Sequence, residues 1–591
     1  MHYTNLKKQE DNKKTLLKRG YALAPFYFLI ILMFNRIKFI FTFTFIAYFL
    51  CFTLSCKKKE QDNIPTPSPL LLIDNQVNNA SSKTIYYQVN NTAVIRLFFN
   101  NPMDKATVIN GINFYENAVG VVPVNYTYEK NDSVIVITPQ ITLKYLSKYI
   151  LSINNTLAST QKALFTTNNF TIGYVTIIDS TDKFPILSDN ALLDKVQQQT
   201  CKYFWDFGHP ISGMARERNT SGDLVTTGGT GFGIMSIIAA VNRNFITRTE
   251  GRDRILKITN FLLNNCTRYH GAFAHWVNGA TGATIPFSPN DNGADLVETS
   301  YLINGLLTAR QYFNGADAIE TELRTKINSI WNGVEWNWFR QNNQNVLYWH
   351  WSPNLNWIIN QQIRGWNEAL IVYVLASSSL TDSIPKVVYD NGWAGNGSIR
   401  NNNTYYGYSL PLGPSNGGPL FFAHYSFLGI NPNGLMDAYG NYQTQTINHT
   451  KINYEYCKAN PRGYYGYSNL CWGLTACDIP TGYGSNEPNN DRGVIAPTAA
   501  LSSFPYTPTE SMNALKFFYY KLGDKLWGPY GFYDAFSLKD LWFANSTLAI
   551  DQGPIIVMIE NYRSGLLWNL FSGAPEIKNG LRRLGFTAPY L

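Results

Sequence analysis

The segments ADLVETSYLINGLL (294–307) and RGWNEALIVYVLA (364–376) combine long apolar runs with carboxylic acids. Their apolar residues recur at the three- and four-residue spacing of helices that are buried on most sides. Asp295 and Glu298 lie in the first segment and Glu368 lies in the second. Burying a carboxylate costs free energy unless something compensates for it. Because paired carboxylates in an aromatic cleft perform glycoside hydrolysis, these three are the predicted catalytic residues.

A third segment, STLAIDQGPIIVMIENYRSGLLWNLF (546–571), repeats the pattern. Asp551 precedes Gln-Gly-Pro, so it either lines the same cleft or caps or ends a helix. Glu560 and Arg563 are three residues apart and are predicted to pair with each other. Asp551 is therefore a predicted substrate-binding residue, and Glu560 a structural one.

Residues 187–591 read as helices joined by loops rich in Gly, Asn, Pro and aromatic residues. Amphipathic spacing is clear at 191–207, 251–266 and 316–331. We expect roughly ten to twelve helices, which suits a toroid of inner and outer helices better than a four-helix bundle. Residues 380–450 read more as loop than as helix.

Residues 75–179 follow a different pattern. Short alternating runs at 93–99, 132–139 and 148–153 are separated by turn residues, which predicts a β-sandwich. The segment FFNNPMDKATV (98–108) and the runs after it resemble the bacterial Ig-like domains that precede catalytic domains in exported enzymes. We expect this domain to be a spacer, with glycan binding as the alternative role.

The N-terminal leader carries most of the net positive charge. Residues 1–59 hold 11 of the 48 Lys and Arg residues but only 2 of the 40 Asp and Glu residues. The remainder of the chain is close to neutral, so its charge gives no support to a nucleic-acid partner. A near-neutral, aromatic-rich body suits a neutral ligand better than a polyanion.

The leader also contains an apolar run, Phe39 to Leu54, followed by Ser55-Cys56. This order resembles a bacterial lipoprotein signal with Cys56 as the lipidated residue, and Met33 is then the expected true start. The alternative is an uncleaved transmembrane anchor. Both predict export, with residues 57–74 as a tether and the cell envelope as the location.

Five cysteines remain beyond the leader: Cys201, Cys266, Cys457, Cys471 and Cys477. An odd number allows at most two disulfides. Their spacing matches no zinc pattern. The sequence therefore predicts no metal.

Eight motifs occur in a definite order and together resemble one bacterial family, first labelled putative glucoamylase, whose characterised branch contains endo-β-1,2-glucanases. The resemblance implies an (α/α)6 barrel and inverting hydrolysis with neither metal nor other cofactor. It also implies that Asp295, Glu298 and Glu368 line the catalytic cleft. The motifs are TTGGTGFGIMSIIAAVNR (226–243), ADLVETSYLINGLL (294–307), RGWNEALIVYVLA (364–376), PLFFAHYSF (419–427), GYSNLCWGLTACD (466–478), IAPTAALSSFPYTP (495–508), GPYGFYDAF (528–536) and LAIDQGPIIVMIENYRSGLLW (548–568).

An inverting enzyme needs a protonated acid and a carboxylate base about 6.5–9.5 Å apart. Asp295 and Glu298 share one helical turn and are too close to form that pair. We therefore expect one partner from this turn and the other to be Glu368, with the acid and base roles left open. The structural alternative for Asp295 is that it caps a helix N-terminus.

Aromatic and polar residues in the loop-rich motifs are candidates for sugar contacts, because aromatic rings cover the C–H faces of sugars. The alternative for each tryptophan is core packing, and for each histidine a satisfied structural role. Arg218, His275 and His424 could also hydrogen-bond to sugar hydroxyls. The predicted contacts are Trp276, Trp349, His350, Trp351, Trp366 and Arg216.

The leading expectation is an exported hydrolase of a β-glucan polysaccharide or oligosaccharide, most simply a β-1,2-linked one. One alternative keeps the toroid and changes the linkage or the sugar. A second alternative is a surface lipoprotein that binds glycans without cleaving them. The sequence leaves endo or exo action and the oligomeric state open.

Overall fold

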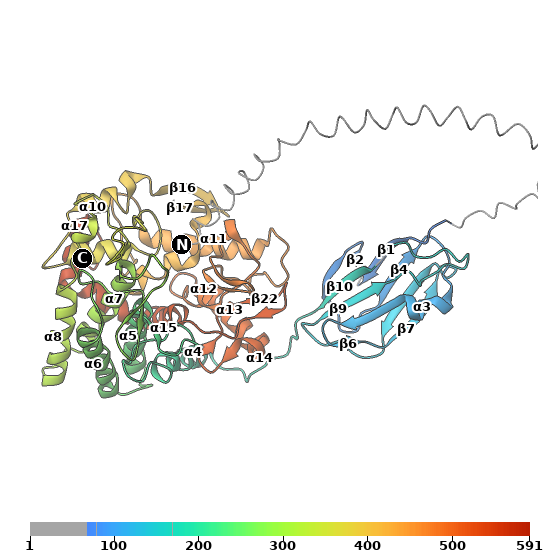
Figure 1. Ribbon diagram of the computed structural model, residues 1–591, viewed down its shortest axis with the longest axis horizontal. Helices are drawn as coiled ribbons and strands as arrows, with labels where there is room; N and C mark the ends of the chain where they lie inside the picture. Colours follow the sequence, from blue (N-terminus) through green and yellow to red (C-terminus); the bar gives the residue numbers. More distant parts are fainter. Residues whose placement is uncertain (1–67, 78–79, 168) are drawn as a thin grey trace, which may run out of the picture. The chain divides into compact units, whose positions relative to one another are not determined.

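A computed structural model describes residues 68–77, 80–167 and 169–591 (Figure 1). The leader with Met33 and Cys56, and the tether up to residue 67, lie outside the described residues. No helix within the described ranges is both long and apolar enough to cross a bilayer.

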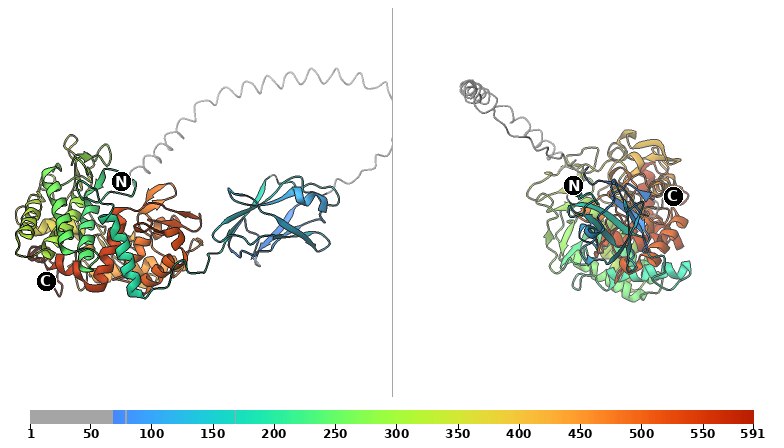
Figure 2. Two further views of the ribbon diagram at one scale, coloured as in Figure 1. Left: turned by 90° about the horizontal axis from the view of Figure 1, so that it is seen from below. Right: turned by 90° about the vertical axis from the view of Figure 1, so that its right-hand side faces the viewer.

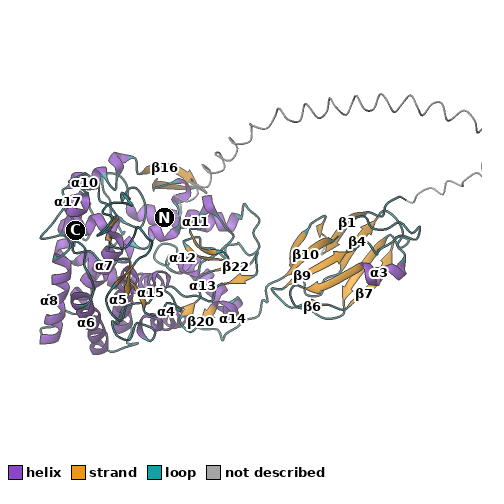
Figure 3. Ribbon diagram, viewed as in Figure 1, coloured by secondary structure: helices purple, strands orange, loops and turns teal. Residues whose placement is uncertain are grey.

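The N-terminal domain is built from two five-stranded sheets (Figure 3). Their strand orders are β2-β1-β4-β8-β7 and β3-β10-β9-β5-β6, and every pair is antiparallel except β10 with β3. The strands are β1 (Leu72–Val77), β2 (Ala80–Ser81), β3 (Ile85–Val89), β4 (Ile95–Phe99), β5 (Ile112–Glu116), β6 (Gly120–Val121), β7 (Val124–Glu129), β8 (Val134–Pro139), β9 (Lys148–Ile153) and β10 (Phe170–Thr176).

Alternating side chains of both sheets meet in one apolar core. Leu97 and Ile137 come from one sheet, and Leu151 and Ile172 from the other. One short helix, α3 (Lys105–Gly111), is capped by Asp104 through the Ala106 N–H. The sandwich expected from the alternating runs is confirmed, and in β4 and β9 every second residue is buried, as a period of two requires.

The rest of the described chain is mainly helical. Its α-helices are α4 (Asp189–Trp205), α5 (Thr227–Asn242), α6 (Arg248–Asn264), α7 (Leu296–Tyr312), α8 (Ala318–Asn332), α9 (Leu370–Ser378), α10 (Lys386–Asn391), α11 (Tyr442–Ala459), α12 (Pro497–Leu501), α13 (Pro508–Lys516), α14 (Gly523–Leu526), α15 (Ala549–Ser564), α16 (Leu566–Gly573) and α17 (Pro575–Leu584).

Two kinds of helix are distinguished by their burial. Helices α5, α7 and α9 are buried over almost their whole length, whereas α6 and α8 bury one face only. Helix α5 packs against α7 and α15, and α7 packs against α9 (Figures 1 and 2). A fully apolar helix must lie inside the domain, so this group forms its inner layer.

Glycines allow the two innermost helices to approach each other closely. A Cβ atom on Gly231 of α5 would lie 2.1 Å from the carbonyl oxygen of Tyr301 on α7. A Cβ atom on Gly305 would lie 2.3 Å from the carbonyl oxygen of Gly231. The glycines of TGGTGFG therefore allow close packing of the two helix backbones, which is the role expected of this motif at the start of a helix.

Short strands and turns connect the helices. Residues 380–441 contain α10, the hairpin β16 (Arg400–Tyr405) with β17 (Tyr408–Leu412) and several 3-10 turns, and α11 begins only at Tyr442. The prediction that 380–450 is mainly loop is therefore confirmed for residues 380–441 and wrong from Tyr442 onward.

All five described cysteines are buried, unpaired thiols. Burial raises the pKa of each one. A thiol held protonated in an apolar core is chemically inert.

Candidate active site

Asp295 caps helix α7. It forms strand β14 (Ala294–Asp295) and its Oδ1 accepts hydrogen bonds from the backbone N–H groups of Val297 at 3.0 Å and Glu298 at 2.9 Å. Its Oδ2 accepts from Nδ1 of His275 at 3.0 Å. The capping alternative is therefore confirmed, and the second oxygen still faces a histidine. Both oxygens of Asp295 are occupied within the protein.

Glu298 lies in the first turn of α7 and points at the start of α5. Its Oε2 accepts from the Gly228 N–H at 2.8 Å and from the Thr226 hydroxyl at 3.3 Å. A Cβ atom on Gly228 would lie 2.5 Å from this oxygen, so the contact requires glycine. A helix N-terminus favours a negatively charged partner. Oε1 has only Nε2 of His275 nearby, at 4.0 Å.

His275 supplies positive charge between the two acids. Burial alone would lower its pKa, but the charge of Glu298 and the hydrogen bond with Asp295 raise the pKa to about 9. The ring is therefore an imidazolium at neutral pH. Burial raises the pKa of Glu298, and the His275 charge and the Gly228 N–H oppose this rise. His275 thus helps both acids remain ionised.

Glu368 lies in a turn two residues before α9, and not inside the helix as its segment suggested. Its backbone carbonyl accepts hydrogen bonds from the hydroxyls of Ser426 and, at 3.4 Å, Tyr301. Tyr301 lies on α7 one turn beyond Glu298, so this contact ties the turn to that helix. Among the hydrogen bonds of the described chain, none joins the Glu368 carboxyl to another side chain.

The environment of Glu368 favours its protonated form. Burial raises its pKa to about 7, and the negative charges of Asp295 and Glu298 also act in this direction. At neutral pH a large fraction of this carboxyl carries a proton. The two glutamates therefore have different surroundings: Glu298 accepts from one N–H and one hydroxyl beside the His275 imidazolium, and none of the described hydrogen bonds reaches the Glu368 carboxyl from another side chain.

A second pair of acids lies beneath α15. Asp551 occupies the first turn of this helix, which continues through Pro554, so Asp551 does not end a helix. The second acid is Asp534, whose Oδ2 accepts from the Asp478 N–H. Burial and the charge of Asp534 raise the pKa of Asp551 well above its usual range, and burial and Asp478 raise the pKa of Asp534 to about 7. The charge of a neighbouring acid thus favours the protonated form of each.

A cavity of about 350 Å³ lies over Glu298. Trp276 lines it as expected, with its ring 4.6 Å from that of Phe287. This volume lies within the range typical of small-molecule sites. The full lining comprises Glu217, Arg218, Thr226, His275, Trp276, Phe287, Glu298, Tyr483, Leu548 and Ile550.

The segment Trp349-His350-Trp351 borders the same region. Strand β15 (His350–Trp351) pairs with β14, which places His350 opposite Asp295, with Nε2 at 3.6 Å from Oδ2. The ring of Trp349 stacks on His350, and that of Trp351 packs against His270. Burial lowers the pKa of His350 to about 4, so this ring is neutral.

Two predicted sugar contacts lie elsewhere. Trp366 is only 4% exposed and packs against Trp393 and Phe427 in the core, which leaves no face for a sugar. The guanidinium of Arg216 donates to the carbonyls of Gly222 and Phe207 and is thereby committed to the backbone. Both are corrections to the sequence reading, which had no information on packing.

The expected Glu560–Arg563 pair is also wrong. Glu560 is fully buried and pairs at 2.7 Å with Arg243, the residue that follows α5, whereas Arg563 reaches Asp194 of α4 at 2.5 Å. Residues three apart share a helix face, but here each finds its partner on a different neighbouring helix. Glu560 is structural, as expected. His424 is likewise buried and contacts Ser503 at 3.0 Å.

Donor atoms of His275, Asp291 and Asp295 lie within 4.8 Å of one another, close enough to hold a cation. Burial and Asp295 raise the pKa of Asp291 to about 7. Within this group His275 forms an ion pair with Asp295, with Nδ1 and Oδ2 3.0 Å apart.

Comparisons with known proteins show which families this chain is similar to. Residues 360–575 match the family described as "Putative glucoamylase", and residues 76–173 match "Bacterial Ig-like domain". The exo β-1,2-glucooligosaccharide sophorohydrolase (non-reducing end) of Parabacteroides distasonis is 47% identical over 421 residues, 67% of this chain. The match spans 58% of that relative's length.

Two solved structures match over their full length. A putative glucoamylase from Bacteroides uniformis is 55% identical, covers 69% of this chain and 100% of its own, and has a TM-score of 0.68. The endo-β-1,2-glucanase from Chitinophaga pinensis, solved with sophorotriose and glucose, is 48% identical with the same coverages and a TM-score of 0.67.

Proposed function

This chain belongs to the putative glucoamylase family, and we propose that it is a glycoside hydrolase that cleaves β-1,2-linked glucan with inversion at the anomeric carbon. Two relatives are named as enzymes of β-1,2-glucans or their oligosaccharides, one exo-acting and one endo-acting. The observation that carries the mechanism is the contrast between Glu298 and Glu368. Glu298 accepts from the Gly228 N–H beside the His275 imidazolium, and Glu368 has its pKa raised to about 7 by burial.

In the proposed reaction Glu368 is the general acid and protonates the glycosidic oxygen as the bond to the anomeric carbon breaks. Glu298 is the general base and removes a proton from the attacking water through Oε1, the oxygen with no hydrogen bond. Asp295 has no free oxygen, so its role is to orient His275 and the start of α7. His275 balances the charge of Glu298 before the proton moves.

Trp276 is the proposed platform for the sugar next to Glu298, since it lines the cavity there. Trp349, His350 and Trp351 form the proposed wall on the side of Asp295. Asp551, which holds its proton, is proposed as a donor to a sugar hydroxyl.

A toroid explains why the helices differ in burial. We propose that residues 187–591 form an (α/α)6 barrel with α5, α7, α9 and α15 in its inner ring. The extensive burial of these helices and their mutual packing support this arrangement. The candidate acids then lie at the ends of inner helices.

The test of the function is a panel of glucans with different linkages incubated with the purified protein. We expect reducing ends from β-1,2-glucan and, by NMR of the first product, the α-anomer that inversion of a β-bond produces. Release of reducing ends only from another glucan would favour the alternative of a toroid hydrolase with a different linkage or sugar. Glycan binding without release from any glycan would favour a surface binding protein, and a retained anomer would reject the mechanism.

Export and anchoring are proposed from the leader alone. We propose that Cys56 is lipidated, that the segment after it tethers the protein to the cell envelope and that the β-sandwich is a spacer. The expected boundary between tether and domain at residue 74 is too late, because Leu70 already lies in the core of the sandwich and Leu72 begins β1. Cys56→Ala should release the protein from the membrane fraction or leave an uncleaved precursor. Unchanged mass together with unchanged fractionation would reject the anchor.

A further inference from the structure

A second, larger hollow lies beside the cavity over Glu298. Its volume is about 620 Å³, against about 350 Å³ for the first. Arg218 and Tyr483 line both hollows, so the two hollows adjoin each other at these side chains. None of the candidate catalytic residues Asp295, Glu298 and Glu368 lines the larger hollow.

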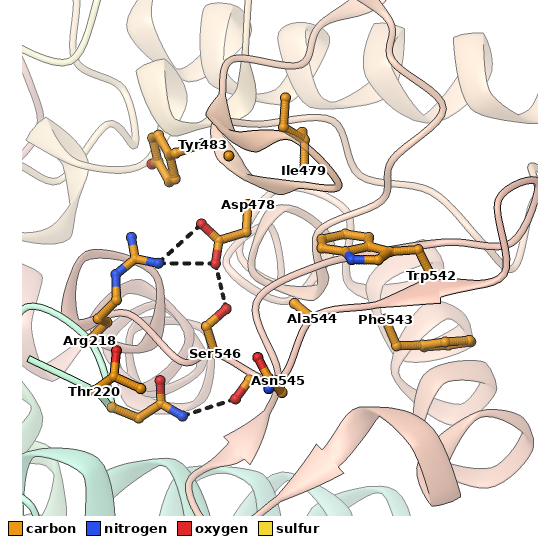
Figure 4. A pocket seen from close by; sticks show the side chains of 12 residues that line it. Arg218, Thr220, Asp478, Ile479, Tyr483, Trp542, Phe543, Ala544, Asn545 and Ser546 are labelled. Atoms are coloured by element: carbon orange, nitrogen blue, oxygen red, sulfur yellow. Dashed lines mark hydrogen bonds and ion pairs between the residues drawn. The ribbon is translucent and has the colours of Figure 1, made fainter.

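One tryptophan of this hollow has a ring that no aromatic neighbour covers. Trp542 lies on β23 (Trp542–Phe543), which pairs with β22 (Phe536–Ser537), and its side chain is half-buried. It takes part in no aromatic pair found among the described residues, unlike Phe543, which stacks on Phe536. Figure 4 shows its indole on the opposite side of the hollow from Arg218. The indole packs in part against the small apolar cluster of Cys477, Val494, Ala496 and Ala535, and the part that lines the hollow can serve as a platform for a sugar ring.

Leu541, the residue before Trp542, supports a fixed orientation of this ring. Its φ is +52°, a conformation that a residue with a branched side chain rarely adopts. A hairpin that keeps such a residue is held by its surroundings, and strained backbone concentrates where a side chain must be aimed.

The arginine on the polar side of the hollow is already paired. Arg218 pairs with Glu217 at 2.9 Å and with Asp478 at 3.3 Å. The Ser546 hydroxyl donates to the same Asp478 carboxylate, and Figure 4 shows both contacts of Asp478. A guanidinium already paired with two carboxylates is a poor site for a phosphate or sulfate. Polar groups of this kind can bind the hydroxyls of a neutral ligand, and Asn219, Thr220 and Asn545 add further polar side chains.

We propose that this hollow is a distal glucan-binding site that holds the part of a long substrate chain extending past Arg218 and Tyr483, with Trp542 as its stacking platform. The inference rests on the proposed function and adds a chain-length preference to it. A short oligosaccharide fills the cavity over Glu298 only. A longer chain also fills the second hollow and gains binding energy there.

The test is Trp542→Ala assayed on purified β-1,2-linked oligosaccharides from the trisaccharide upward and on the polysaccharide. The measured quantity is the ratio of kcat/KM on long chains to kcat/KM on the shortest chain cleaved. Loss of one stacking platform should lower this ratio about threefold to tenfold. Trp542→Phe keeps a ring and should retain most of the ratio.

Trp276→Ala is the matched control, because Trp276 lines the cavity that every substrate must enter. It should lower kcat/KM at all chain lengths and leave the ratio nearly unchanged. An equal loss at all lengths in Trp542→Ala, or no loss at any length, would overturn the distal site.

A second experiment, which measures binding and not cleavage, separates this inference from the proposed function. Glu368→Gln and the double variant Glu368→Gln/Trp542→Ala are run in native gels that contain β-1,2-glucan, where bound protein is retarded. Weaker retardation of the double variant supports the distal site even if the protein cleaves nothing. Equal retardation of both contradicts the distal site. Absence of hydrolysis by the unmodified protein contradicts the function alone.

Discussion

Replacement of Glu368 by glutamine is the sharpest test of the proposed mechanism. Glutamine keeps the size of the side chain but cannot donate a proton as a carboxylic acid does. The turn is held through the backbone carbonyl of Glu368, which accepts from Ser426 and Tyr301, and the substitution leaves these contacts in place. We therefore expect a folded protein.

The expected loss of turnover is about 10²- to 10⁴-fold, the usual contribution of one general acid. At about 1.4 kcal/mol per decade this is a rise of about 3–5 kcal/mol in the activation barrier. In the unmodified protein the rate should also fall as pH rises above about 7, because the acid must be protonated and burial raises its pKa to about that value.

The assay compares two substrates in the Glu368→Gln protein. Release of reducing ends from β-1,2-glucan should show the full loss, because its leaving oxygen needs a proton. A β-glycosyl fluoride should show a much smaller loss, because fluoride leaves without one. The control is Glu455→Gln, which alters a partly exposed glutamate paired with Lys458 on α11 and should leave both rates unchanged.

An equal loss on both substrates would refute the acid role and assign Glu368 to binding or positioning. Near-native turnover on glucan would remove it from the mechanism altogether. The next candidates for the acid would then be Asp295 and Asp551.

Glu298→Gln should lower turnover about 100-fold or more. In the pH–rate profile of its residual activity, the fall in rate on the alkaline side should begin at a lower pH than in the unmodified protein, because the charge of Glu298 no longer raises the pKa of Glu368. Glu368 should make folding less stable as pH rises above the ordinary glutamate value, because the folded state binds its proton more tightly; the melting-temperature advantage of Glu368→Gln should therefore grow from pH 5 to pH 8. Arg243→Met leaves Glu560 buried without its cation and should cost about 2–4 kcal/mol in urea unfolding, a loss that Arg243→Met/Glu560→Gln should partly restore.

The sequence alone determined the broad organisation of this protein. Alternation with a period of two predicted the sandwich, and apolar runs with a period near 3.6 predicted the buried helices, because both patterns are local. The acids in those runs were informative for the same reason: a carboxylate in an apolar helix needs a partner or a task. Asp295 and Glu298 were singled out in this way, and Trp276 as an aromatic residue in a loop-rich motif.

Only the tertiary structure decided how these residues are used. Glu298 meets the N–H of Gly228, 70 positions away, and Arg218 meets Asp478, 260 positions away. Asp534 lay unnoticed within a quoted motif because its significance depends on the carboxyl of Asp551 beside it.

The same limit explains the errors. The sequence pattern predicted Trp366 as a platform for a sugar, but its side chain is packed in the core. The spacing predicted that Glu560 pairs with Arg563, but it pairs with Arg243. Local pattern fixes which residues face inward. Proton affinity, ion pairing and the exposure of a ring depend on neighbours that only the folded chain brings together, because desolvation and Coulomb interactions act through space and not along the sequence.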